Sequence, residues 1–371
     1  MDPVILFFAL GVIAGVAKSD LRVPPAIYDL LSMLLLLTIG LKGGVELARS
    51  PFGGLLPQIV AVLAMGFILP LFLFGIARIG NRLARPDAAS LAAHYGSVSV
   101  ATFAVGVAFL AERNVSYDSQ LPLFLVLLEI PAIIVGILLA RSMKGGTQWG
   151  KLLHEILLGK SIVLLVGGLL IGWLSGPDGI RPLEPLFFDL FKGVLALFLL
   201  EMGLIAAGQV KALRERGLFL VAFGILVPVP MATVGALVGW SIGLSVGGTT
   251  LLAVLAGSAS YIAAPAAIRI ALPEANPSLS LTASLGVTFP FNIFLGIPIY
   301  FAIANALHGV GGYTHAGYRT QAANYHHRSP ARERTLRSHR QDGRDRLHGH
   351  ECQGLGEPWR TRCRLGLEWQ H

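Results

Sequence analysis

The sequence GSVSVAT, residues Gly96–Thr102, places small and hydroxyl-bearing residues in the middle of an apolar run that covers Ala88–Leu110. A related sequence, GSAS at Gly257–Ser260, begins 161 positions later inside the apolar run Leu251–Leu272. We expect both runs to be membrane helices that are interrupted at these polar residues. Pro265, which follows the second cluster, is expected to interrupt its helix as well. The two interruptions would then face one another.

The composition of the 371-residue chain predicts an integral membrane protein. Hydrophobic residues make up 54% of the chain and charged residues 13%, against about 25% charged residues in an ordinary soluble domain. Because so sparsely charged a chain cannot hide this apolar surface from water, lipid must be its solvent. We expect an all-α protein, with no cofactor other than a coupling ion.

The net charge of +8 arises mainly in the last part of the chain. Residues 311–371 hold 11 arginines, six acidic residues and no lysine, which leaves 18 basic and 15 acidic residues before them. We expect 309–371 to be an Arg/His-rich tail that is disordered or translated out of frame. Both cysteines, Cys352 and Cys363, lie there. The preceding part of the chain therefore has no cysteine for a disulfide or a metal site.

About ten apolar segments are long enough, intact or broken, to cross the roughly 30 Å hydrocarbon core of a bilayer. No positive charge precedes the first of them, which favours a span with the N-terminus outside over a cleaved signal peptide. The segments are approximately Pro3–Ala17, Pro24–Leu47, Phe52–Ile79, Ala88–Leu110, Ser119–Ala140, Leu157–Ser175, Leu183–Val210, Gly217–Ile242, Thr249–Leu272 and Pro277–Leu307.

The basic residues between the segments support this topology. Loops that would face the cytoplasm carry 13 Lys and Arg residues, and loops that would face outside carry only Arg49, Arg113 and Arg181. This asymmetry follows the positive-inside rule. It also puts the tail outside, which argues against a nucleic-acid-binding role for its arginines.

Three sequence matches divide the chain into two halves. Leu36–Leu41 matches Leu199–Leu204 at an offset of 163, the two GSxS clusters match at 161, and Glu129-Ile130 matches Asn292-Ile293 at 163. Five helices per half would make the second half enter the membrane in the opposite sense, as inverted repeats. We expect repeats at 1–141 and 157–308, joined by a cytoplasmic linker at 142–156.

The two interrupted helices offer chemistry that suits a small anion together with a cation. The N-terminal end of a half-helix presents unpaired N–H groups and a positive dipole end, and C-terminal carbonyls suit sodium. Hydroxyl groups can serve either ion, so the candidates are Ser97, Ser99, Thr102, Ser258 and Ser260. The alternative is that these small residues only allow helices to pack closely.

Ionisable residues within the apolar segments are further candidates, because burying them in a membrane is costly. Glu129 and its repeat partner Asn292 are expected to be cation ligands or supports for the broken helices. His94 is expected to be structural, with a proton relay as the alternative. Lys42 and Glu46 are expected to extend their charged ends to the membrane surface.

No catalytic pattern is present in the sequence. We find no P-loop, no metal-spaced His and Cys set before the tail, and no Ser-His-Asp grouping that helix periodicity would bring together. We therefore expect a transporter driven by an ion gradient rather than an enzyme.

Six motifs, in order, resemble the sodium-dependent bicarbonate transporter family first known from cyanobacteria. The resemblance covers approximately Pro3–Leu307. The motifs are LLTIGLKGGVE at 36–46, YGSVS at 95–99 with Thr102, EIP at 129–131, FKGVLALFLLEMG at 191–203, GSASYIAAP at 257–265 and TFPFNI at 288–293.

This resemblance implies two inverted five-helix repeats that form a gate domain and a core domain with crossed broken helices. It implies a homotrimer in the cell inner membrane, sodium-coupled import of bicarbonate, and regulation by a PII-like protein. The implied substrate pocket consists of Gly96, Ser97, Val98, Ser99, Ser258, Ala259 and Ser260. The implied sodium ligands are Ser99, Thr102, Glu129, Ser260 and Asn292, although Glu129 stands where the family leads us to expect aspartate. The alternatives are a sodium symporter for another small anion, a cation/proton antiporter of similar architecture, and a membrane sensor or scaffold.

Overall fold

The computed structural model describes residues 3–49, 54–79, 83–140, 150, 154, 157–210, 213 and 218–311. These residues belong to one compact unit, Met1–Gly312. Most of the expected linker at 142–156, and the expected tail beyond Gly311, lie outside the described residues. All regular secondary structure in the described part is helical, which confirms the all-α prediction.

The helices follow the expected apolar segments closely. Their bounds are α1 Pro3–Val16, α2 Pro25–Arg49, α3 Leu55–Arg78, α4 Arg85–Gly96, α5 Val100–Glu112, α6 Leu121–Ala140, α8 Lys160–Ile180, α9 Phe191–Gly208, α11 Leu218–Leu226, α12 Pro228–Ser241, α13 Val246–Ala256, α14 Ala263–Ala271, α15 Pro277–Ala283, α16 Phe289–Phe291 and α17 Ile297–Gly311. Single π-helical turns at Ser284–Thr288 and Asn292–Gly296 join the last three helices into one bent segment.

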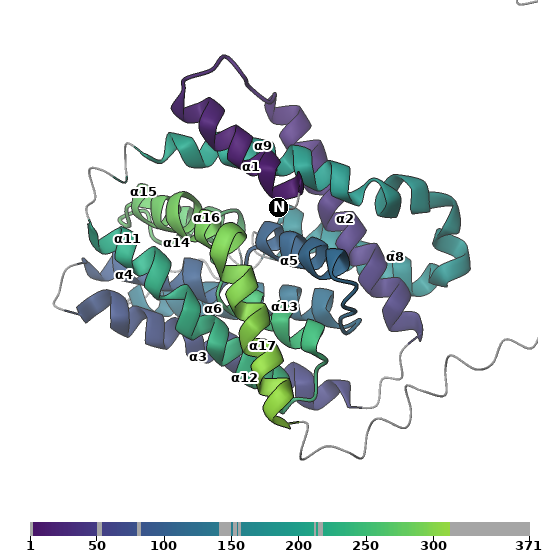
Figure 1. The fold of residues 1–371 in the computed structure, drawn as a ribbon. Coiled ribbons are helices and arrows are strands. Elements are labelled where there is room, and N and C mark those ends of the chain that lie inside the picture. Colours follow the sequence, from purple (N-terminus) through teal and green to yellow (C-terminus); the bar gives the residue numbers. More distant parts are fainter. Residues whose placement is uncertain are drawn as a thin grey trace, which may run out of the picture. The chain divides into compact units, whose positions relative to one another are not determined.

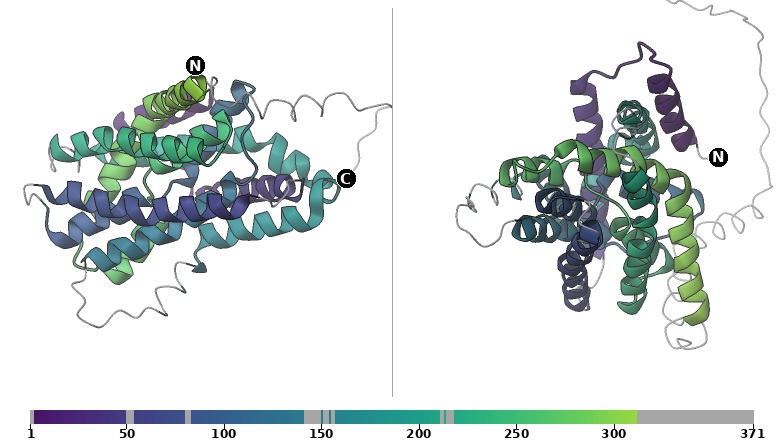
Figure 2. Two further views of the ribbon diagram at one scale, coloured as in Figure 1. Left: turned by 90° about the horizontal axis from the view of Figure 1, so that it is seen from below. Right: turned by 90° about the vertical axis from the view of Figure 1, so that its left-hand side faces the viewer.

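Eight helical segments among the described residues are long and apolar enough to cross a membrane. The other two expected spans are shorter, because α1 has 14 residues and the ninth segment is divided into α13 and α14. The left view of Figure 2 shows most of the long helices running side by side. The count of ten spans stays a prediction.

Four helices form one packed group, in which α2 lies along α8 and α1 lies along α9 (Figure 1). Glycines allow both pairs to approach closely. A Cβ added to Gly40 on α2 would lie 3.1 Å from the Cα of Gly168 on α8, and one added to Gly11 on α1 would lie 3.1 Å from the Cα of Gly203 on α9. Small residues at a helix crossing are typical of membrane proteins, where close van der Waals contact drives association.

The remaining helices form a second group around the two interrupted segments. Helices α3 and α6 pack on α4, and α12 and α17 pack on α13, whereas contacts with the four-helix group are sparse. Residues 88–110 are buried apart from the partly buried Val100, and residues 247–260 are buried throughout. Helices that are apolar on all sides belong at the centre of a bundle, so the first interrupted segment and α13 lie in the interior, whereas α14 has exposed positions such as Arg269 and Ile270.

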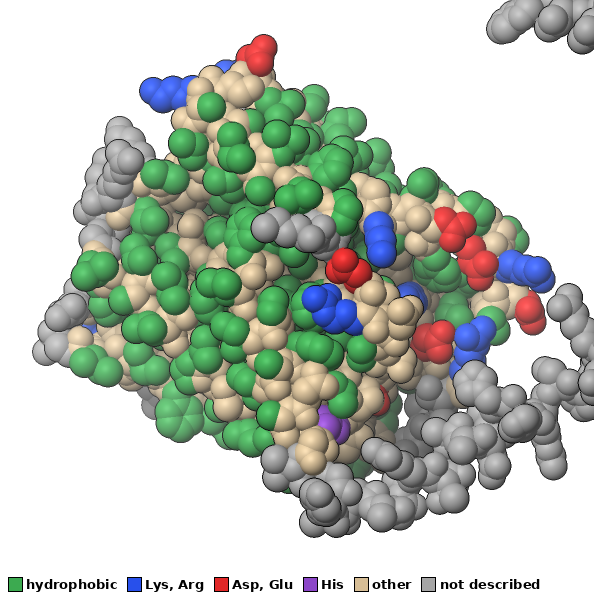
Figure 3. Space-filling model, in the orientation of Figure 1, with side chains coloured by type: hydrophobic (Ala, Val, Ile, Leu, Met, Phe, Trp, Pro, Cys, Tyr) green, Lys and Arg blue, Asp and Glu red, His purple; other side chains and the backbone are tan. Residues whose placement is uncertain are grey.

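The outer surface is strongly apolar. Leu56, Leu174 and Leu218 are 70%, 77% and 81% exposed. Figure 3 shows a face covered mainly by hydrophobic side chains, with the charged residues gathered mostly toward the side where α2 and α8 end in Figure 1. Such extensive exposed apolar surface is unfavourable in water and favourable in lipid.

Candidate functional site

The first interruption lies between α4 and α5, as the sequence predicts. Helix α4 ends at Gly96, and Ser97 adopts an extended conformation with φ −85° and ψ 179°. Ser99 caps α5, because its Oγ accepts a hydrogen bond from the Thr102 N–H at 3.1 Å. Serine is a favoured N-cap residue because its oxygen satisfies an N–H group that the helix leaves free. The serine thus both ends the extended segment and starts the second half-helix.

The second interruption covers residues 257–262, between α13 and α14. The Ser260 Oγ accepts from the Ala264 N–H at 3.1 Å, near the start of α14. Pro265 is the third residue of α14. The prediction that Pro265 interrupts this helix is wrong. A proline is tolerated in the first turn of a helix, because the N–H that it lacks would have no partner within the helix there.

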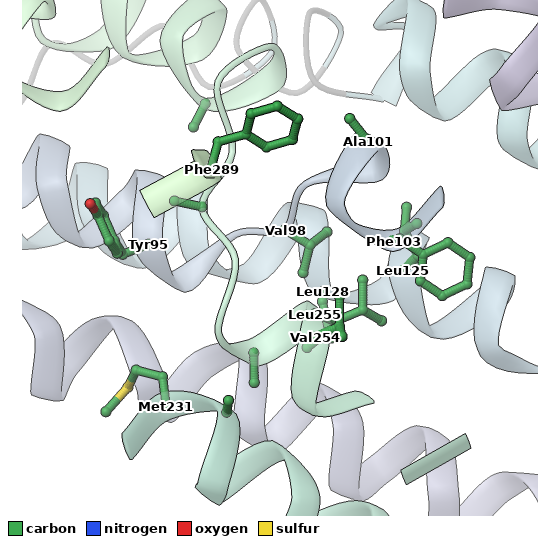
Figure 4. Close-up of a cluster of buried hydrophobic side chains, with 14 of the residues drawn as sticks. Tyr95, Val98, Ala101, Phe103, Leu125, Leu128, Met231, Val254, Leu255 and Phe289 are labelled. Carbon is green, nitrogen blue, oxygen red and sulfur yellow. The ribbon is translucent and has the colours of Figure 1, made fainter. Parts of the chain in front are cut away.

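The two interrupted segments cross and are hydrogen-bonded to each other. The Ser99 N–H donates to the Ser258 Oγ at 2.9 Å, and the Ser260 N–H donates to the His94 carbonyl oxygen at 2.7 Å. In Figure 4 the unwound chain after Val254 and Leu255 runs past Val98. The crossing therefore brings the N-terminal ends of α5 and α14, where N–H groups and positive dipole ends are available, to one interior place.

A cavity of about 10 Å³ lies at this crossing. Among the predicted site residues it brings together Val98, Ser99, Glu129 and Ser260, and its other lining residues are Val100, Ser161, Tyr261 and Ile262. A volume of roughly 10–15 Å³ holds about one water molecule. In this conformation the space between the polar groups of the crossing is therefore no larger than about one water molecule.

Glu129 is the one carboxylic acid in the lining of this cavity. It is 2% exposed, and its Oε2 has no hydrogen-bond partner within the described residues. The Ser97 Oγ donates to the Glu129 carbonyl oxygen at 3.3 Å, which fixes α6 against the first interruption. A buried carboxyl oxygen without a partner is costly unless a proton or a cation satisfies it, so Glu129 has the chemistry of a cation ligand.

Other predicted residues support the crossing without lining its cavity. The Asn292 Nδ2 donates to the Gly257 carbonyl oxygen at 2.9 Å, and its Oδ1 accepts from the Tyr300 hydroxyl at 2.7 Å. The Thr102 Oγ1 donates to the Ser99 Oγ at 2.9 Å. The Ser258 Oγ donates to the Leu255 carbonyl oxygen at 2.8 Å. Their role in binding sodium or substrate stays a prediction.

Gly96, Ala259 and His94 complete the predicted set. A Cβ on Gly96 would contact Pro70 of α3 and Ala132 of α6, so this glycine is required for packing. Ala259 is 4% exposed. The His94 Nδ1 lies 2.7 Å from the Ser90 carbonyl oxygen in the preceding turn. The bond from Ser260 involves only the His94 backbone, and the His94 Nε2 has no hydrogen-bond partner within the described residues, so the structural role of this side chain stays a prediction.

Ser161 and Tyr261 line the cavity, but they were not identified as site residues from the sequence. Ser161 lies near the start of α8, in the four-helix group, and so carries no local sign of a site. Tyr261 directly follows the GSAS cluster, and its buried hydroxyl lies beside Ser99. A polar residue adjoining a predicted break was a usable signal for Tyr261, whereas only the tertiary structure could bring in Ser161. The described residues contain no group of three or more His, Cys, Asp or Glu side chains able to hold a metal ion.

Comparison with known families gives one match over most of the chain. Residues 3–305 match the model of the Na+-dependent bicarbonate transporter superfamily. The chain belongs to this superfamily. No curated protein matches it. As a member of the Na+-dependent bicarbonate transporter superfamily with several apolar helices, it is a multi-pass membrane transporter rather than an enzyme, and the expected resemblance is confirmed.

Proposed function

We propose that this protein imports bicarbonate together with sodium by alternating access, and that both ions bind at the crossing of the interrupted helices. The observation that carries the proposal is the meeting of two half-helix N-termini at a small cavity lined by the buried residues Ser99, Ser260 and Glu129. Helix N-termini and hydroxyls stabilise an anion, and hydroxyl and carboxylate oxygens suit a hard cation.

Sodium and bicarbonate would use different parts of the crossing. The Glu129 carboxylate supplies a negative charge that a sodium ion needs in a membrane interior. The N-termini of α5 and α14 supply positive dipole ends for the anion. When both ions are bound, the sodium charge is opposed by bicarbonate and by the Glu129 carboxylate, and the positive dipole ends of α5 and α14 offset the remaining negative charge. This reciprocal stabilisation provides the coupling between the two fluxes.

The packing supports inverted repeats and two moving parts. The pair of α1 with α9 corresponds to the pair of α8 with α2 when the halves are exchanged, and each pair crosses at glycines. At the matching positions, the backbone carbonyl of Glu129 accepts from Ser97 of the first interruption, and the Asn292 side chain donates to Gly257 of the second. We propose that α1, α2, α8 and α9 form a gate domain, and that the other helices form a core domain which moves against it.

Further expectations follow from the family resemblance and belong to the same proposal. We place the protein in the cell inner membrane with its N-terminus outside, as a homotrimer that a PII-like protein regulates. The distribution of basic residues supports the orientation. The first test of assembly is the mass of the purified complex in detergent, for which a homotrimer is expected.

Uptake of labelled bicarbonate into proteoliposomes tests the proposed function. An inward sodium gradient should drive uptake, and an equal potassium gradient should not. Glu129→Gln, which keeps the shape of the side chain, should raise the sodium concentration for half-maximal uptake about tenfold or more, since a lost charged interaction costs roughly 1.5–3 kcal/mol.

Absence of sodium-dependent bicarbonate uptake by the unmodified protein would refute the function. Sodium-driven uptake of another anion, or sodium-driven proton efflux, would instead support one of the two alternative transporters. Unchanged sodium dependence in Glu129→Gln would remove this carboxylate from the sodium site.

A further inference from the structure

Three neighbouring cavities share Lys42, near the C-terminal end of α2. The largest, of about 370 Å³, is lined by Lys42 and Glu46 of α2, Val107 and Ala111 of α5, and the segment after α5. A second, of about 210 Å³, extends between α2 and the end of α8. A third, of about 60 Å³, is lined by Thr38, Ile39, Lys42, Val107, Tyr117, Phe188 and Phe191. We call these three spaces together the outer vestibule.

Lys42 is the charged group of the smallest vestibule cavity. The other lining residues there are apolar or carry only a hydroxyl, and the Thr38 Oγ1 donates to the Phe187 carbonyl oxygen at 3.1 Å. The Lys42 Nζ lies 5.8 Å from the centre of the Tyr117 ring. Among the described residues no carboxylate forms an ion pair with Lys42, whereas the nearby Glu46 and Arg49 pair with each other at 3.2 Å.

Tyr117 adds a neutral hydrogen-bond donor. It lies in the segment between α5 and α6. Burial, together with the negative charge of Glu46, raises the pKa of the Tyr117 hydroxyl, which therefore stays protonated at neutral pH. The Lys42 ammonium group is exposed and lies over the face of the Tyr117 ring. Together with the Thr38 and Tyr117 side chains it lines a cavity far smaller than the roughly 300–1,000 Å³ typical of larger ligands, which suits a small monovalent anion.

The vestibule and the crossing both adjoin α5, which contacts α2. Val107 of α5 lines the vestibule, and Val100 and Ala101, at the start of α5, line a further apolar cavity of about 20 Å³ with Leu35 and Leu36 of α2. Seven residues of helix separate Val107 from Val100, a distance of about 10 Å. The cavity that Lys42 lines and the cavity at the crossing thus adjoin α5 two helical turns apart.

We propose that Lys42 and Tyr117 form an outer anion-capture site, which binds bicarbonate before it reaches the crossing. This inference rests on the proposed transport function. Over the three cavities Lys42 and Arg49 are balanced by Glu46 and Glu184. The attraction for an anion is therefore local to the smallest cavity, where Lys42 is the charged lining residue, and the small volume limits the size of the anion. The site is separate from the crossing, so its loss impairs capture and leaves the later steps intact.

Bicarbonate uptake by Lys42→Gln tests this site. The apparent KM for bicarbonate should rise about tenfold with little change in the maximal rate, because a charge-assisted contact made on binding is lost. Lys42→Arg should restore most of the affinity. Arg181→Gln is the matched control, because it removes an exposed outer charge that lines none of the three cavities. An unchanged KM in Lys42→Gln, or an equal rise in Arg181→Gln, would overturn the capture site.

A second measurement separates this site from transport itself. Ser116, which is exposed and lines the largest vestibule cavity, is changed to cysteine in a protein whose Cys352 and Cys363 are replaced by serine. Bicarbonate should slow labelling of Ser116→Cys by an anionic methanethiosulfonate but not by a cationic one, and Lys42→Gln should abolish the effect. Equal labelling with and without bicarbonate would refute the capture site even if transport is observed. Protection without transport would refute only the proposed function.

Discussion

Ser99 holds the centre of the site through its backbone and its side chain. Its N–H donates to Ser258 on the opposite segment, while its Oγ accepts from both the N–H and the Oγ1 of Thr102. The residue type was sufficient to predict a cap and a polar interruption. Its exact partners were not predictable, because the contact with Ser258 joins residues 159 positions apart.

Asn292 is a second residue whose contacts could not be predicted from the sequence. The sequence identified it as polar within an apolar segment, and hence as a sodium ligand or a support. In the structure both ends of its amide are hydrogen-bonded to Gly257 and Tyr300. Which of the two roles an amide takes depends on the neighbours that the fold provides. Here they are Gly257, which follows α13, and Tyr300, which lies in α17.

Asn292→Ala should therefore destabilise the protein by about 2 kcal/mol or more, since it leaves a buried carbonyl and a buried hydroxyl without partners. Tyr300→Phe is the matched control and should cost about half as much, because the bond from Asn292 to Gly257 remains. Thermal unfolding of the purified protein in detergent measures both. A larger loss in Tyr300→Phe than in Asn292→Ala would contradict a supporting role for the amide.

Helix breaks and helix contacts belong to the scale of the element. Both interruptions were predicted from glycine and serine within apolar runs, since few other features distinguish them locally. The position of Pro265 in the first turn of α14 was not predicted. A proline is compatible with either a helix break or a first turn, and only the residue at which α14 starts decides between them.

The glycine contact between α2 and α8 gives a test at this scale. A Cβ on Gly40 would lie 2.6 Å from the Leu165 carbonyl oxygen, so Gly40→Ala should force the helices apart and cost about 1–3 kcal/mol. Gly167→Ala, on α8 itself, would meet nothing within 4 Å and should be neutral or slightly stabilising. Thermal unfolding compares the two variants. Equal stability of both would contradict a close crossing of α2 and α8.

At the scale of the whole molecule, the cavities differ sharply between the outer vestibule and the crossing. The vestibule offers about 370 Å³ in its largest part, and the crossing about 10 Å³. The vestibule and the apolar cavity beyond it adjoin the contact between α2 of the four-helix group and α5 of the second group, where packing between the groups is sparse. This arrangement suits a relative movement of the two groups that opens the crossing to one side at a time.

Only part of this organisation could be predicted from the sequence. Offsets between Leu36–Leu41 and Leu199–Leu204 indicated two related halves, and the helix pairs of the structure are compatible with them. The division into two packed groups, however, mixes helices from both halves, because α1 and α2 pack with α9 and α8. This mixing of helices from both halves arises from tertiary packing, and hydrophobic periodicity does not predict it.

Sodium-driven bicarbonate uptake by a variant carrying both Ser99→Ala and Ser260→Ala tests the central claim most directly. The account predicts that uptake is lost, because the hydroxyls of both interruptions are removed from the crossing. Since the same hydroxyls accept from the Thr102 and Ala264 N–H groups, uptake is compared at equal amounts of folded protein. Ser241→Ala, at an exposed serine at the end of α12, serves as the control and should transport normally. Sodium-driven uptake at the unmodified rate in the double variant would contradict the claim that the crossing is the transport site.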